Sequence, residues 1–91
     1  MPGITELPAN EVLARVKALI KERPALESEL KTAWNGVIDA IESRALKARP
    51  KPKVFEVNHE TEVARLVLFR SLLAGDRLDV CAVKALARVG L

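Results

Sequence analysis

The stretch EVARLVLFRSLLAG, residues 62–75, decides the fold of this chain. In a helix its large apolar side chains cover more than one face, and Gly75 at its end is typical of a helix C-terminus. These apolar residues are Val63, Leu66, Val67, Leu68, Phe69, Leu72 and Leu73. A helix that is apolar nearly all round is buried on several sides. We therefore expect a helix over residues 59–74 that is either central to the fold or part of a subunit interface.

Three further helices are expected along the chain. Apolar residues at helical spacing predict helices over residues 8–23, 24–48 and 79–89, and Pro8 and Pro24 suit the starts of the first two. Gly36 is the weak point of the long second helix. Because the apolar stripe keeps its phase through Gly36, we expect a continuous helix that lets another helix approach closely there. The predicted fold class is all-α, a small four-helix bundle forming one domain over residues 1–91.

The helical pattern is broken by RPKPKVFEV, residues 49–57. Pro50 and Pro52 favour an extended path, so we expect a proline-rich extended connector. Val54, Phe55 and Val57 are expected to hold this connector against the core. Asn58 is a favourable N-cap residue, which places the start of the third helix at residue 59.

The positive charge of the chain is concentrated beside this connector. The net charge is +3, but residues 44–53 hold five basic side chains and no acidic one. These are Arg44, Lys47, Arg49, Lys51 and Lys53. One interpretation is structural, because cations near a helix C-terminus offset the helix dipole and bind the last carbonyl groups. The other is that the five residues contact an anionic partner, such as the phosphates of a nucleic acid.

Within this basic stretch, KARPKPK, residues 47–53, resembles the AT-hook, a short minor-groove-binding segment with an Arg-Gly-Arg-Pro core. Arg49 and Pro50 match the final Arg-Pro of that core. Ala48 stands in place of its glycine and Lys47 in place of its first arginine. A methyl group at residue 48 obstructs the close approach to the groove that glycine allows. Contact with phosphates does not depend on this resemblance, because it needs only positive charge within reach.

Few side chains of this sequence are suited to catalysis or to binding a metal. There is one histidine, one cysteine and no tyrosine. His59 and Glu62 would share a helix face, which we expect to be solvated; a metal site built across a symmetric dimer is the alternative. Cys81 is expected to pack as a small apolar residue in the core. We therefore expect no enzymatic activity, no cofactor and no metal.

The function favoured by the sequence is a non-catalytic interaction module that self-associates, as a homodimer, or binds a protein partner through apolar helix faces. Trp34 is expected to anchor the core, or to be an interface hot spot. The candidate interface residues are Trp34, Leu68, Phe69 and Leu72. Nucleic-acid binding through residues 44–53 is the alternative function. The apolar stretches are too short and too charged to span a bilayer, and no signal peptide is visible, so we expect a cytoplasmic protein without a membrane partner.

Overall fold

The computed structural model describes residues 7–91, which form four helices and no strand. The helices are α1 (Ala9–Glu22), α2 (Ala25–Lys47), α3 (Val54–Leu73) and α4 (Leu78–Arg88). The all-α class is confirmed, and α2 is the longest helix with 23 residues. Among the helices of this described part, none combines the length and the apolar character needed to cross a membrane.

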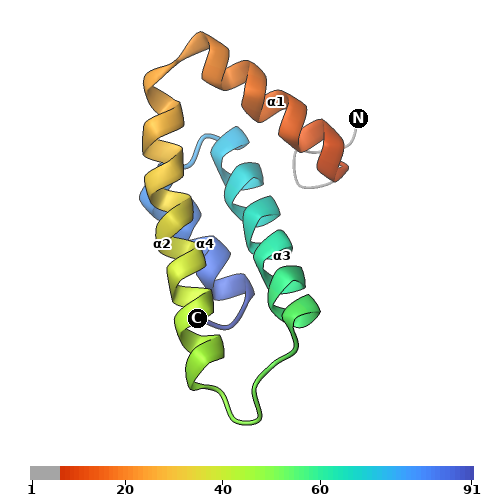
Figure 1. Cartoon of the computed structure of the whole chain (residues 1–91). Helices are drawn as coiled ribbons and strands as arrows, with labels where there is room; N and C mark the ends of the chain where they lie inside the picture. Colours follow the sequence, from red (N-terminus) through yellow and green to blue (C-terminus); the bar gives the residue numbers. More distant parts are fainter. Residues whose placement is uncertain (1–6) are drawn as a thin grey trace.

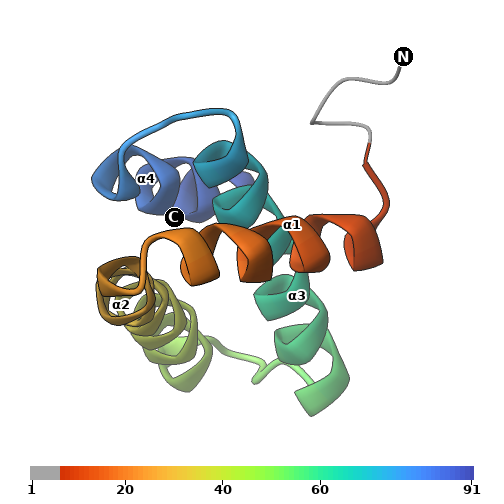
Figure 2. The ribbon, with the colours of Figure 1, turned by 90° about the horizontal axis from the view of Figure 1, so that it is seen from above.

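Helices α2, α3 and α4 lie together as one group, and α1 crosses one end of that group (Figure 1). Seen from above, α1 runs from the start of α2 across to α3 (Figure 2). Helix α3 contacts all three other helices and packs most extensively against α4. Of the two places expected for this helix, central to the fold or in a subunit interface, the contacts of α3 show the central one. The end of the group opposite α1 is formed by the C-terminus of α2, residues 48–53 and the N-terminus of α3.

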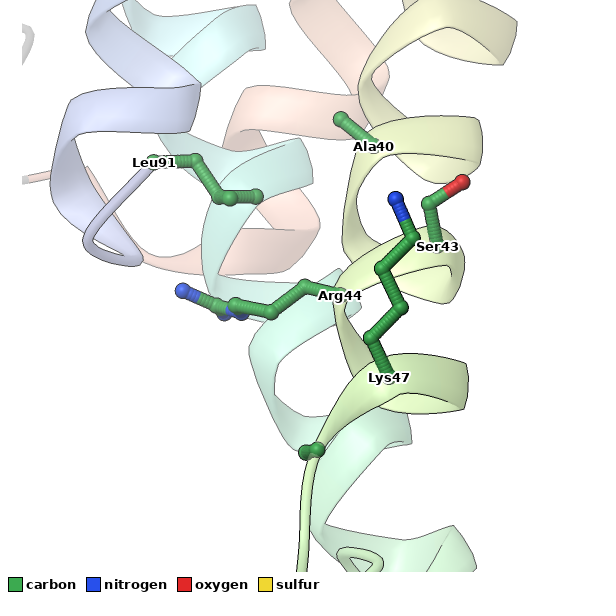
Figure 3. A pocket seen from close by; sticks show the side chains of 6 residues that line it. Ala40, Ser43, Arg44, Lys47 and Leu91 are labelled. Carbon is green, nitrogen blue, oxygen red and sulfur yellow. The ribbon is translucent and has the colours of Figure 1, made fainter.

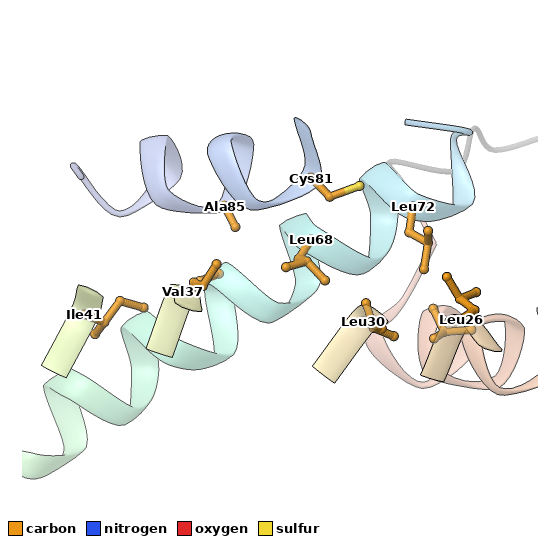
Figure 4. Packing of buried hydrophobic residues seen from close by; sticks show 10 residues of the cluster. Leu26, Leu30, Val37, Ile41, Leu68, Leu72, Cys81 and Ala85 are labelled. Atoms are coloured by element: carbon orange, nitrogen blue, oxygen red, sulfur yellow. The ribbon is translucent and has the colours of Figure 1, made fainter. Parts of the chain in front are cut away.

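The core consists of side chains that converge from α1, α2, α3 and α4, eight of which Figure 4 labels. Leu68 of α3 is fully buried. Ala64, Cys81 and Ala85 are also fully buried on α3 and α4. Because the distance between two helix axes depends on the side chains between them, these small residues allow α3 and α4 to approach closely. The expected core position of Cys81 is confirmed.

Two helices end on glycines whose backbone is left-handed, Gly75 with φ of 95° and Gly90 with φ of 82°. After α3, the N–H of Asp76 donates to the carbonyl of Ser71 at 3.0 Å. After α4, the N–H of Leu91 donates to the carbonyl of Leu86 at 2.8 Å. Both are the long hydrogen bonds of a Schellman ending. Gly75 therefore ends α3 as the sequence predicts, and it turns the chain from α3 into α4.

The predicted start of α3 is wrong, because the helix begins at Val54 rather than at residue 59. Lys53 takes the extended N-cap conformation, and its backbone N–H donates to Glu56 Oε2 at 3.2 Å. Val57 packs against the core at helical spacing from Ala64, which favours continuing the helix back through residues 54–58. Contrary to expectation, Val54 and Phe55 do not hold the connector against the core, since both are exposed.

The expected role of Gly36 is only half correct. Helix α2 continues through this glycine, as the phase of its apolar stripe predicts. A Cβ atom at residue 36, however, would meet nothing within 4 Å. No other helix approaches there, because the face of α2 that carries Gly36 is turned to solvent.

Gly36 lies inside a helix and Gly75 has a left-handed backbone, so substitution by alanine is expected to have opposite effects on stability at the two positions. Gly36→Ala is expected to raise the free energy of unfolding by about 1 kcal/mol, because alanine is the better helix former and has room there. Gly75→Ala is expected to lower it by about 1–2 kcal/mol, because its left-handed backbone strains any residue with a Cβ atom. Urea unfolding followed by circular dichroism measures both. A loss of stability in Gly36→Ala would contradict a continuous α2.

Candidate functional site

Exposed apolar and basic side chains meet at the end of the molecule opposite α1, a surface we call the tip. It comprises the last turn of α2, residues 48–53 and the first turn of α3. Its exposed large apolar and basic side chains are Leu46, Lys47, Arg49, Lys51, Lys53, Val54 and Phe55. Four of the five basic residues singled out in the sequence therefore lie on the tip.

The fifth basic residue, Arg44, is bound within the fold. Its Nη1 donates to the carbonyl of Val89 at 2.6 Å, and its Nη2 pairs with Glu60 Oε2 at 2.5 Å. Figure 3 shows Arg44 reaching from α2 toward the end of α4. The guanidinium thus joins α2, α3 and the turn after α4, and it is satisfied without an external anion.

The basic residues of the tip differ in what they bind. Arg49 Nη1 donates to the carbonyls of Leu46 and Ala48, at 3.1 and 2.8 Å, as the helix-end interpretation predicts. Lys47, Lys51 and Lys53 form no ion pair within residues 7–91. These three ammonium groups are the ones left for an external anionic group.

Three large apolar side chains accompany these cations. Leu46 is 66% exposed, Val54 76% and Phe55 66%. The Nζ of Lys53 lies over the ring of Phe55, 5.9 Å from its centroid, within the range of a cation–π interaction. The exposure of these three large apolar side chains at one end of the molecule is consistent with a surface that binds a partner.

Several grooves border the tip, and two of them lie along the last turns of α2. The first, which we call the α2–α3 groove, has a volume of about 300 Å³ and is lined by Glu42, Ala45, Leu46, Lys51, Pro52 and Val57. The second, of about 470 Å³, lies between α2 and the end of the chain and is shown in Figure 3. In the second groove Lys47 lies along α2 and Leu91 extends from the turn after α4. Each groove therefore places a lysine beside aliphatic groups.

The interface residues predicted from the sequence lie elsewhere. Leu68 and Leu72 are buried in the core of the single chain, because α3 is covered by all three other helices. Leu68 is fully buried and Leu72 is only 8% exposed, so neither offers a large surface to a partner. Trp34 and Phe69 are half-buried and pack against the same core. For Trp34 this is the expected anchoring position.

The exposed apolar residues of the tip were not recognised from the sequence as candidate interface residues. Leu46 carried a usable signal, because it lies off the stripe that continues from Val37 through Ile41 to Ala45. Val54 and Phe55 carry no such signal if the third helix begins at residue 59, because both residues then belong to the connector. Their exposure follows from the helical phase that turns Val57 inward.

The remaining reactive side chains do not form a site. His59 and Glu62 are exposed, and Glu62 pairs with Arg65 at 2.8 Å. Among residues 7–91 no three His, Cys, Asp or Glu side chains are grouped to hold a metal ion. Burial, and secondarily the negative charge of Asp76, raises the pKa of the Cys81 thiol, which disfavours the reactive thiolate.

Comparison of this chain with protein-family models, with curated proteins and with solved structures found no match in any of the three. Its function is therefore argued from the tip itself.

The bonds of Arg44 predict a loss of stability when its side chain is removed. Arg44→Ala is expected to lower the free energy of unfolding by about 1–2 kcal/mol, since a charged hydrogen-bonded group is lost from a site only partly exposed to water. Lys47→Ala, one turn further along α2, is the matched control. It should change the free energy of unfolding by less than about 0.5 kcal/mol. Equal effects in urea unfolding would show that Arg44 does not hold the helices together.

Proposed function

We propose that this chain is a non-catalytic interaction module that binds a protein partner through the tip. The observation that supports this proposal is the exposure of three large apolar side chains, Leu46, Val54 and Phe55, on the tip. The tip also carries Lys47, Lys51 and Lys53, which form no ion pair within residues 7–91. Burying one such apolar side chain is worth about 1.5–3 kcal/mol, so three of them provide a substantial driving force for association. Cations around an apolar centre match the composition of a protein interface, with its polar rim.

Two further observations favour binding over catalysis. The only thiol of the chain, Cys81, is buried and held in its neutral form. His59, the only imidazole, is exposed on the first turns of α3, close in sequence to carboxylates rather than to a nucleophile. A catalytic nucleophile requires a base within hydrogen-bonding distance, and Cys81 is instead within 3.7 Å of the Asp76 carbonyl.

The proposal is tested by selecting peptides from a random display library on the immobilised chain. The triple variant Leu46→Ser, Val54→Ser, Phe55→Ser removes the apolar part of the tip, and its residues are all exposed, so it should fold. The matched control, Val80→Ser with Val83→Ser, removes exposed apolar residues from α4. We expect enriched peptides that bind the wild type and the α4 control but not the tip variant. Peptides that bind all three equally, or no enriched peptides, would refute the proposal.

Binding of nucleic acid is a second candidate function. It is favoured by Lys47, Lys51 and Lys53, which form no ion pair within the described residues 7–91, together with Arg49 on the same surface. With Arg44 occupied, these four cations would neutralise at most four phosphates. The logarithm of the association constant should then fall against the logarithm of salt concentration with a slope of about −3.6.

Fluorescence anisotropy of a labelled random DNA duplex, at about 50 and about 200 mM salt, measures this slope. Lys51→Gln with Lys53→Gln should make the slope less negative by about 2, whereas Lys17→Gln with Lys21→Gln, two exposed lysines of α1, should leave it unchanged. A duplex that does not bind at about 50 mM salt would eliminate this second function.

A further inference from the structure

We infer that the partner bound by the tip is an acidic amphipathic protein segment. One bulky apolar side chain of this segment would enter the α2–α3 groove, and its carboxylates would face Lys51 and Lys53. The inference rests on the proposed function, since it names the chemistry of the partner that the tip takes.

The size and lining of the α2–α3 groove indicate a single apolar side chain. Its volume of about 300 Å³ is at the lower end of the range for sites that hold a whole small molecule. Ala45, Leu46, Pro52 and Val57 supply aliphatic surface, and Val57 also packs against the core. Val57 is therefore a wall of the groove that the fold holds in place. Leu46 forms another wall, and its side chain is largely exposed until a partner covers it.

The charges around this groove indicate that the segment is acidic. Lys51 lines the groove, and Lys53 lies two residues further along the same connector. Neither forms an ion pair within the described part of the chain. Carboxylates placed opposite them would complement their charge, which increases specificity and the rate of association.

The same surface is less suited to a polyanion than to a protein segment. Glu42 lines the groove beside Lys51, so a phosphate chain, which is charged at every unit, would meet a like charge there. A protein segment can instead place its apolar side chain at that point. Phosphates would also leave Leu46, Val54 and Phe55 in water, because they offer no apolar surface. A protein segment that carries both carboxylates and a large apolar residue satisfies the lysines and covers these side chains.

The tip-dependent peptides recovered by display test this inference through their composition and their response to salt. We expect them to combine an excess of Asp and Glu with at least one Leu, Ile, Met, Phe or Trp. For a synthesised peptide of this set, replacing Asp and Glu by Asn and Gln should weaken binding about tenfold, as should raising salt from about 50 to about 200 mM. Isothermal titration calorimetry measures both.

Matched variants of the full chain locate the contact. Lys51→Gln with Lys53→Gln should weaken binding of the acidic peptide about fivefold or more, and Lys17→Gln with Lys21→Gln on α1 should not change it. Tip-dependent peptides that are neutral or basic would overturn this inference and leave the proposed function intact. An absence of tip-dependent peptides would instead refute the proposed function. A random DNA duplex that binds the tip more tightly than any acidic peptide would show a polyanion site and overturn the inference.

Discussion

The burial of α3 against three neighbouring helices is the constraint on which the rest of this structure depends. Leu68 at its centre is fully buried, and the small residues Ala64, Cys81 and Ala85 let α4 lie close to it. Helix α2 covers a second side along its length, while α1 crosses one end. With these sides covered, the large apolar side chains that α3 leaves exposed lie at its N-terminus. Its N-terminal turn, which carries Val54 and Phe55, projects beyond the core and becomes part of the tip.

The five basic side chains of segment 44–53 make different contacts in the folded chain. Arg44 points inward and binds Glu60 and the Val89 carbonyl, so its charge is used to join three helices at the end opposite α1. Arg49 binds carbonyl groups at the end of α2. Lys47, Lys51 and Lys53 project from the same end with no carboxylate partner among residues 7–91. A guanidinium, with its several donors in a planar fork, suits the two bonded positions better than an ammonium group would.

The apolar and basic parts of the tip have a common origin in the start of α3. Beginning the helix at Val54 sets a phase that turns Val57 inward and leaves Val54 and Phe55 outside. The same start leaves only residues 48–53 to cross from α2 to α3, which brings Lys51 and Lys53 beside those side chains. Cations and exposed apolar groups therefore meet on one small surface, which is the physical basis of the proposed interaction with an acidic protein segment.

The sequence by itself determined the four helices, the continuity of α2 and the glycine ending of α3, because helical periodicity and turn residues act within a few positions along the chain. It left open whether α3 is central to the fold or part of a subunit interface. It also located the positive charge. Only the tertiary structure decided which residues are free to bind. Arg44 is satisfied by groups 16 and 45 positions away, and Leu68 is covered by the other helices of the same chain rather than by a partner. The start of α3 likewise depended on the packing of Val57 against the core. Such contacts join residues that are distant in sequence, and local patterns do not encode them.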